Sequence, residues 1–240
     1  MVSDCERFKD YYYKYLNFDG KENIVCSEER DKKVNIFYYP IIVSFYDNKV
    51  IYSISEKYYD DLKEILKNKD LKNEENIIFF LSKYFKKIGK DVDIQKMYRM
   101  TKKQDIDVDI SKVVKIDENV KKEYFNSFEH HNDMKYKEEK WNKIKNMMYL
   151  NGVIENGRIV SLGFVSNIDY EAANIVVQTN EKYQNKGYGK NIVKKISRDL
   201  LDDDILPIYW VNAENKPSIK LAKDIGFEEK SIEIVVKYKK

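Results

Sequence analysis

The chain has 240 residues, 42% of them hydrophobic and 35% charged, a length that suits one large domain or two small ones. Its 20 Tyr, 11 Phe and 2 Trp supply enough ring surface for a core, and 8 Gly and 3 Pro exclude collagen-like or low-complexity architecture. The net charge of +3, with few arginines among 44 basic residues, argues against a nucleic-acid-binding module.

The first ten residues lack the apolar core of a signal peptide, and no apolar run approaches the ~20 residues of a membrane-spanning helix. The two cysteines, Cys5 and Cys26, cannot by themselves form a disulfide framework or a metal site. We therefore expect a cytoplasmic protein that binds neither a metal nor a membrane.

The first half, residues 1–105, is predicted to be a smaller α/β domain of unknown role that begins with a helix around Tyr11. Apolar residues alternate on both sides of Pro40, which predicts two strands or one broken strand. A turn at 47–49 leads into a further strand. Two amphipathic helices follow, the first capped by Ser55 and the second ended by Gly89. The polar stretch 101–109 is predicted to connect the two domains.

The second half, residues 106–240, begins with a strand near Val113, a helix capped by Asp117 or Asn119, and a helix over 137–150. A hairpin then pairs 152–155 with 158–161 across Asn156-Gly157, which supplies the positive φ angles of a type I′ turn. The remaining predicted elements are a strand at 173–179, a helix at 189–201, a strand at 205–211, a helix at 218–225 and a strand at 231–238.

The loop after Thr179 contains two glycines, Gly187 and Gly189, and an amphipathic helix begins there. The first N–H groups of a helix lack intrahelical partners and carry partial positive charge, so this junction suits an anion, phosphate above all. Lys186 and Lys190 add positive charge. The spacing fits neither a nucleotide-hydrolase loop nor the dinucleotide fingerprint. The alternative to an anion site is a tight turn between strand and helix that binds no ligand.

A strand followed by Gln184-x-x-Gly187-x-Gly189 resembles the signature of the GNAT superfamily of acyl-CoA-dependent N-acyltransferases. A second match lies downstream and consists of Asn215, Ser218, Leu221-Ala222 and Gly226-Phe227. The resemblance covers roughly residues 106–240, and the two-part chain is similar to a bacterial branch that includes antibiotic-resistance acetyltransferases. It implies an α/β (α+β) fold, with a mixed, mostly antiparallel sheet flanked by helices.

The resemblance also implies acetyl-CoA as co-substrate, with its diphosphate on the backbone N–H groups of 184–190 and its pantetheine arm along the preceding strand. A backbone N–H near Val177 would stabilise the oxyanion while a primary amine of a small-molecule or amino-acid-like acceptor attacks the thioester directly. The cofactor-binding residues that it implies are Val177, Thr179, Gln184, Asn185, Lys186, Gly187, Tyr188, Gly189, Lys190, Asn215 and Ser218.

Two positions depart from the family pattern. Ala222 stands where many members carry a Tyr that acts as general acid, and Asn174 stands where an acidic residue often opens the strand. Glu171 is then the candidate general base. The alternative interpretation is that Glu171 is an exposed turn residue without a catalytic role. His130 and His131 lie in a polar segment and are predicted to be solvated, or else to line the acceptor cleft.

Two functions remain open at this point. The first is a catalytic N-acetyltransferase, and the second is a non-catalytic acyl-CoA-binding protein in which the changes at Ala222 and Asn174 reflect lost chemistry. The first half is predicted from its position alone to form a wall of the acceptor site or the contact of a homodimer.

Overall fold

The computed structural model describes residues 4–34, 36–67, 69, 71–102, 109–128 and 133–239. Contacts divide the chain into two compact units. Unit 1 comprises Met1–Met100, Trp210–Lys216 and Glu229–Lys240, and unit 2 comprises Thr101–Tyr209 and Pro217–Glu228. The expected boundary at 105/106 lies outside the described residues and stays a prediction. The last strand, which we expected in the second domain, belongs mainly to unit 1.

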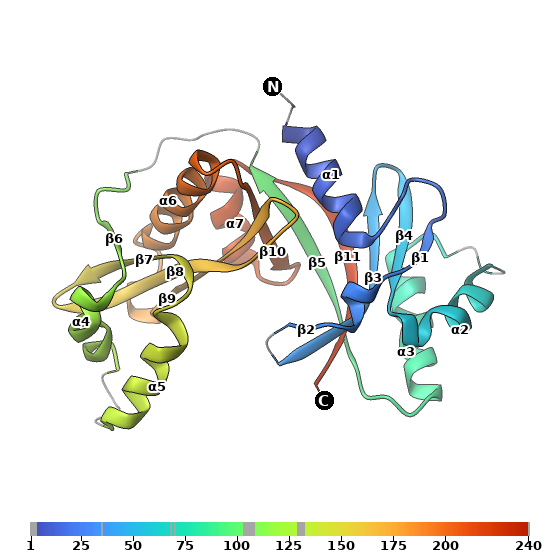
Figure 1. Ribbon diagram of the computed structural model, residues 1–240, viewed down its shortest axis with the longest axis horizontal. Coiled ribbons are helices and arrows are strands. Elements are labelled where there is room, and N and C mark those ends of the chain that lie inside the picture. Colours follow the sequence, from blue (N-terminus) through green and yellow to red (C-terminus); the bar gives the residue numbers. More distant parts are fainter. Residues whose placement is uncertain are drawn as a thin grey trace. The chain divides into compact units, whose positions relative to one another are not determined.

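Unit 1 is a mixed sheet with helices, and Figure 1 labels its elements. Its strands follow the order β1-β4-β3-β11-β5; β1 pairs with β4 in parallel, and β3 pairs with β4 and β11 antiparallel. The elements are α1 (Asp4–Leu16), β1 (Ile24–Cys26), η1 (Glu28–Asp31), β2 (Lys33–Val34), β3 (Phe37–Tyr46), β4 (Lys49–Ile54), α2 (Glu56–Lys67), α3 (Glu74–Lys87), β5 (Asp93–Lys102) and β11 (Phe227–Tyr238).

Strand β3 runs unbroken through Pro40. Its ladder with β11 shifts register between Val236 and Tyr238, opposite the segment that contains Pro40. A proline has no N–H to donate, so it is tolerated where the ladder is already irregular. The two-residue turn that follows β3 has φ angles of 52° at Asp47 and 58° at Asn48, which confirms the predicted hairpin.

The helix ends of unit 1 match the prediction only in part. Ser55 precedes α2, but its buried hydroxyl has no hydrogen-bond partner among the described residues. The carboxylate of Asp31 instead accepts from the N–H of Glu56 at 3.0 Å. The long-range acceptor was not visible in the local pattern that predicted a Ser55 cap. Gly89, with φ at 66°, follows α3 as expected.

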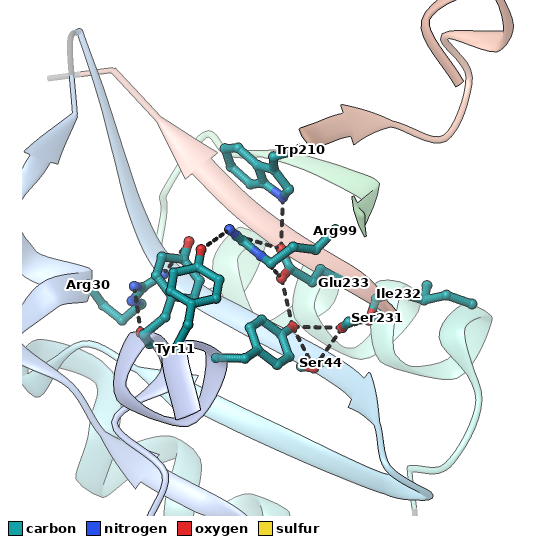
Figure 2. Close-up of polar contacts among 10 residues, drawn as sticks. Tyr11, Arg30, Ser44, Arg99, Trp210, Ser231, Ile232 and Glu233 are labelled. Carbon is teal, nitrogen blue, oxygen red and sulfur yellow. Dashed lines mark hydrogen bonds and ion pairs between the residues drawn. The ribbon is translucent and has the colours of Figure 1, made fainter. Parts of the chain in front are cut away.

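A buried polar network lies between α1 and the sheet of unit 1 (Figure 2). Arg99 of β5 and Glu233 of β11 form an ion pair, with Nε–Oε1 at 2.6 Å. Tyr12 of α1 also donates to Glu233 at 2.7 Å, and Trp210 donates its indole N–H to Oε2 at 2.8 Å. The guanidinium of Arg99 donates to the hydroxyl of Tyr11 at 2.7 Å. Both charges are therefore satisfied in a site away from water.

Unit 2 contains an antiparallel sheet in the order β9-β8-β7-β6, to which β10 is added in parallel beside β9 (Figure 1). This is the mixed, mostly antiparallel sheet flanked by helices that we expected. The elements are β6 (Val113–Lys115), η2 (Glu118–Val120), α4 (Lys121–Asn126), α5 (Met134–Ile144), β7 (Met148–Glu155), β8 (Arg158–Asp169), β9 (Ala172–Thr179), η3 (Glu181–Tyr183), α6 (Tyr188–Asp202), β10 (Leu206–Asn212) and α7 (Lys216–Asp224).

The hairpin at Asn156-Gly157 is confirmed, with φ angles of 51° and 68° and Glu155 paired with Arg158. The helix predicted over 137–150 is wrong at its end, because α5 stops at Ile144 and β7 begins at Met148. Met148 pairs with Val165, so strand pairing overrides a helical apolar pattern that continued past the real end.

Strand β5 was not predicted, and it includes the first two residues of the expected connection. Thr101 and Lys102 are buried strand residues, and the hydroxyl of Thr101 donates to the carbonyl of Pro207 at 2.8 Å. The apolar residues of this segment follow no clean alternation, so the sequence carried little strand signal.

Helix α6 covers the sheet of unit 2 with a buried face that includes Ile192, Val193 and Ile196. The helix lies close to β8 because Gly163 has no side chain there. A Cβ at Gly163 would come within 2.5 Å of Ile192 Cγ2 and 3.2 Å of the carbonyl oxygen of Val176. This close packing fixes the direction in which the first turn of α6 points.

Candidate functional site

The junction between β9 and α6 is a loop with two left-handed residues. The side chain of Asn180 accepts from the N–H of Lys182 at 3.1 Å and starts the short helix η3. Asn185 then has φ at 62° and Gly187 has φ at 82°. A Cβ at Gly187 would meet nothing within 4 Å, so this position favours glycine for its backbone angle and leaves open space beside it.

The first turn of α6 presents backbone donors that have no partner within the described part of the chain. Its first helical hydrogen bond runs from the N–H of Asn191 to the carbonyl of Gly187 at 3.1 Å, so the N–H groups of Tyr188, Gly189 and Lys190 precede the ladder. The helix has no side-chain cap and no acidic residue in this turn. The N–H of Gln184 is one of the donors that the resemblance assigns to the diphosphate, but it already donates to the carbonyl of Glu181 at 3.2 Å. The available donors therefore begin after Gln184.

The two lysines of the loop are ion-paired, which the sequence did not show. Lys190 Nζ lies 2.7 Å from Asp224 Oδ2, and Lys186 Nζ lies 3.7 Å from Glu155 Oε2. The hydrogen bond from Lys190 holds the pKa of the Asp224 carboxyl below its ordinary value. Because each lysine has an acidic partner, an anion at this junction would be held mainly by the backbone donors and the helix dipole.

Gly189 brings three elements together. A Cβ at this position would come within 2.9 Å of Leu221 Cδ1 on α7, 3.4 Å of Thr179 Oγ1 and 3.7 Å of Val177 Cγ2 on β9. The end of β9, the start of α6 and one face of α7 are therefore in contact. Tyr188, the residue before Gly189, is buried and donates its hydroxyl to Glu155.

The backbone of β9 exposes hydrogen-bonding groups beside this junction. The N–H of Asn180 donates to Val160 at 2.9 Å, so by the alternation of an antiparallel ladder Val177 and Thr179 direct their own N–H and C=O groups away from β8. The parallel ladder with β10 consists of three pairs and ends at Ile208↔Asn174. Within the described residues, Val177 and Thr179 thus have ladder partners in β8 alone.

Five further residues singled out in the sequence lie as follows. Asn215 belongs to unit 1, is exposed, and donates its N–H to the carbonyl of Asn212 at 2.9 Å. Ser218 of α7 is half-buried and hydrogen-bonded to the hydroxyl of Tyr209 on β10. Ala222 is fully buried. His130 and His131 lie outside the described residues.

Glu171 lies in the exposed turn between β8 and β9, with φ at 61°. Its carbonyl accepts from the N–H of Leu206 at 2.8 Å. It lies six positions before Val177 in the chain, which is roughly 20 Å at ~3.3 Å per strand residue. A base must lie within hydrogen-bond reach of the proton that it removes, directly or through one water. Direct proton transfer from an amine placed at Val177 therefore does not reach Glu171, and its role stays a prediction.

Residues 169–236 match the model of a protein family described as FR47-like protein. The matched segment is less than a third of the chain. FR47-like domains are related to the GNAT superfamily, so the resemblance seen in the sequence is confirmed for the segment that contains the β9–α6 loop and α7. The narrower placement near antibiotic-resistance acetyltransferases stays a prediction. No curated protein is similar enough in sequence to count as a match.

Among solved structures, the chain is similar to a GNAT-family acetyltransferase from Colwellia psychrerythraea, with 9% identity over 62% of this chain and 57% of that chain and a TM-score of 0.49. It is similar to a GCN5-related N-acetyltransferase-like protein from Streptococcus suis, with 16% identity over 97% and 100% and a TM-score of 0.46. A GCN5-related N-acetyltransferase from Sphaerobacter thermophilus shows 8% identity over 66% and 56% and a TM-score of 0.46.

The matched regions span less than two thirds of the Colwellia and Sphaerobacter chains. Because the identities are low and the TM-scores are below 0.5, these structures carry no weight in the family assignment. The support for that assignment is the FR47-like match. In the described residues, no helix is long and apolar enough to cross a membrane, and no group of three or more His, Cys, Asp or Glu side chains could hold a metal ion.

Proposed function

We propose that the chain is an acyl-CoA-dependent N-acetyltransferase that moves the acetyl group of acetyl-CoA to a primary amine of a small-molecule or amino-acid-like acceptor. The observation that carries the proposal is the uncapped first turn of α6, entered through the left-handed Gly187 within the segment that matches the FR47-like model. A diphosphate would accept hydrogen bonds from the N–H groups between Asn185 and Lys190. Lys186 and Lys190 would then exchange part of their pairing with Glu155 and Asp224 for the ligand.

The pantetheine arm would lie along β9, where Val177 and Thr179 direct backbone groups away from β8. An amide of the arm can pair with such groups as an added strand does. The acceptor nitrogen would attack the thioester carbon directly, and the N–H of Val177 would stabilise the oxyanion that develops. In this arrangement the protein contributes mainly position and electrostatics to the reaction.

Binding of acyl-CoA without catalysis is the second candidate. It is favoured by Ala222, which is fully buried and has no hydroxyl to protonate the departing thiolate. The two functions share the same cofactor site, so they differ only in turnover. Release of free thiol from acetyl-CoA across a panel of primary amines separates them, because only the transferase releases it in an amine-dependent way.

The cofactor site is tested by Gly187→Asp. The added carboxylate lies beside the position proposed for the diphosphate, so we expect acetyl-CoA binding to be abolished. The matched control is Gly157→Asp, which also replaces a left-handed glycine with open space around it but lies in the β7–β8 turn. The measurement is thermal stabilisation by acetyl-CoA, which at 100 times Kd amounts to about 2.7 kcal/mol. Equal stabilisation of wild type and Gly187→Asp would refute this placement of the diphosphate.

The other expectations from the sequence remain part of the proposal. The protein acts in the cytoplasm on a soluble amine, without nucleic acid, membrane or metal, and a homodimer is the proposed assembly. Mass measurement in solution tests the assembly. A chain limited to residues 106–240 tests the role of the first half, and full activity in that fragment would remove the first half from the acceptor site.

A further inference from the structure

Unit 1 contains a cavity beside α2, at the edge of its sheet. The volume of the cavity is about 680 Å³, within the range of roughly 300–1,000 Å³ that small-molecule sites occupy. Every residue that lines it belongs to unit 1, and none of the residues assigned to the cofactor is among them. The cavity is therefore a candidate site for a second ligand.

The floor of the cavity is apolar and comes from the neighbouring strands β1, β4 and β3. Phe45 of β3 pairs with Val50 of β4, and Ile24 of β1 pairs with Tyr52 of β4. Paired residues share a face of the sheet, as do residues two apart in one strand, so these four side chains lie together. Leu66 of α2 belongs to the same apolar cluster and forms a wall.

Cationic side chains surround this floor. They come from β4, from the segment between α2 and α3, and from β11, and they are Lys49, Lys69, Lys72 and Lys230. Among the described residues that line the cavity, Asp47 alone carries a carboxylate. The whole chain holds 44 basic and 41 acidic residues, so this lining has a strong local excess of positive charge. The hydroxyl of Tyr52 donates to the carbonyl of Leu71 at 3.1 Å and ties the segment that carries Lys69 and Lys72 to the floor.

Two of these lysines, Lys49 and Lys69, contact neutral groups. Lys49 Nζ donates to the carbonyl of Gly20 at 3.4 Å and lies 5.1 Å from the centre of the Phe18 ring. Lys69 Nζ lies 5.8 Å from the centre of the Phe80 ring. Neither ammonium has a carboxylate partner within the described part of the chain. An anion in the cavity would supply that partner without displacing an ion pair of either lysine.

We infer that the cavity binds a nucleoside diphosphate, with its planar base on the apolar floor and its diphosphate among the lysines. This site is independent of the proposed function. A single carboxylate would engage one or two ammonium groups, so the charge of the lining favours an anion with several negative charges. The rings of Phe45 and Tyr52 suit a planar partner. The side-chain amides of Asn23 and Asn48 also line the cavity, and they can donate to and accept from the polar edge of a base.

The test is the affinity of the full chain for ADP, measured by calorimetry beside adenosine and inorganic pyrophosphate. ADP should bind more tightly than either fragment, because it alone offers both the base and the charge. Lys49→Met/Lys69→Met removes two charges and keeps apolar stems, so it should weaken ADP binding by about tenfold. The matched control is Lys86→Met/Lys87→Met, which removes two exposed charges of unit 1 outside the cavity and should leave the affinity within about twofold.

Phe45→Leu separates the contribution of the base from that of the charge. The variant keeps an apolar side chain but removes the ring, so ADP should bind more weakly while the affinity for pyrophosphate stays the same. Equal ADP affinity in wild type and Phe45→Leu would overturn the placement of the base on this floor.

ADP also matches the diphosphate end of coenzyme A, so each measurement is repeated in a Gly187→Asp background. ADP binding that persists there and falls with Lys49→Met/Lys69→Met supports the cavity. Loss of ADP binding in Gly187→Asp, equal affinity in wild type and the double lysine variant, or a wild type that binds no ADP would each overturn the inference. A chain that binds ADP in the expected way but not acetyl-CoA would remove the proposed function and leave this inference standing.

Discussion

Arg99 and Glu233 form an ion pair in which both side chains are almost completely removed from water. Arg99 Nε lies 2.6 Å from Oε1, and a second guanidinium nitrogen lies 3.2 Å from Oε2. Tyr12 and Trp210 donate to the same carboxylate, so one acidic group joins α1, β5, β10 and β11 within unit 1 (Figure 2). Removal of either charge leaves the other buried without its partner.

We therefore expect Arg99→Met to lower the free energy of unfolding by about 3–5 kcal/mol, the usual cost of an uncompensated buried charge. The double variant Arg99→Met/Glu233→Met removes both charges and should lose less than Arg99→Met alone. Lys67→Met, which breaks the exposed pair with Glu64, should change stability by under about 1 kcal/mol. Urea unfolding measures all three, and a double variant at least as unstable as Arg99→Met alone would contradict the prediction.

Two glycines beside α6 should differ in how well they tolerate alanine. At Gly163 the new Cβ would meet Ile192 Cγ2 at 2.5 Å and a backbone oxygen at 3.2 Å, neither of which moves easily. At Gly189 the nearest atom is the tip of the flexible Leu221 side chain at 2.9 Å. We expect Gly163→Ala to cost about 1–3 kcal/mol of unfolding free energy and Gly189→Ala to cost less. Thermal or urea unfolding decides the order, and the reverse order would be inconsistent with the packing described.

Lys194 of α6 gives unit 2 a pH dependence in the alkaline range. Burial, together with the nearby Lys102 and Arg198, lowers the pKa of Lys194 to about 8. Below pH 8 the folded protein carries this charge at a cost, while the unfolded chain holds its proton up to an ordinary pKa of about 10.5. Between these values the unfolded state binds more protons, so stability rises with pH.

Lys194→Met should therefore raise stability at pH 7 and flatten the rise between pH 8 and 10. The control is Lys195→Met, a change at the next residue, whose ammonium is partly exposed and pairs with Asp199 at 2.5 Å. Urea unfolding at a series of pH values measures both effects. A wild type whose stability falls over this range would show that the assigned pKa direction is wrong.

Glu171 should contribute little to turnover, because the turn that holds it lies far along β9 from Val177. We expect Glu171→Gln to leave kcat within about twofold of wild type, as surface substitutions away from a site usually do. The measurement is the pH dependence of kcat and of kcat/KM with an accepted amine. A large fall in kcat together with loss of the acidic limb of the profile would establish Glu171 as the base.

Local signals in the sequence predicted the second half of the chain well. The turn at Asn156-Gly157 was placed correctly, although the strands that flank it are longer than expected, and β9, α6, β10 and α7 lie within two residues of their expected bounds. The last strand begins four residues earlier than expected. These segments carry their own turn residues and clear periodicity. The end of α5, the strand β5 and the true cap of α2 were missed, because each depends on a partner distant in the chain.

The features of the candidate site were likewise predicted only where they depend on local sequence. The glycines of the β9–α6 loop were visible as residue types at a fixed spacing, and the structure shows their different uses, a left-handed backbone at Gly187 and close packing at Gly189. The ion pairs of Lys186 and Lys190 and the bond between Tyr209 and Ser218 were not visible, because they join segments that only the folded chain brings together.

The outward-facing backbone of β9 has a consequence for how this protein can change over time. The amide groups of Val177 and Thr179 face away from β8 whatever side chains those positions carry, because the ladder register sets their direction. A ligand held through them is recognised by the main chain, so mutations that preserve the strand can accumulate there without loss of binding. In the proposed acetyltransferase, such a strand would let the acceptor preference of a lineage diverge while the donor stays the same.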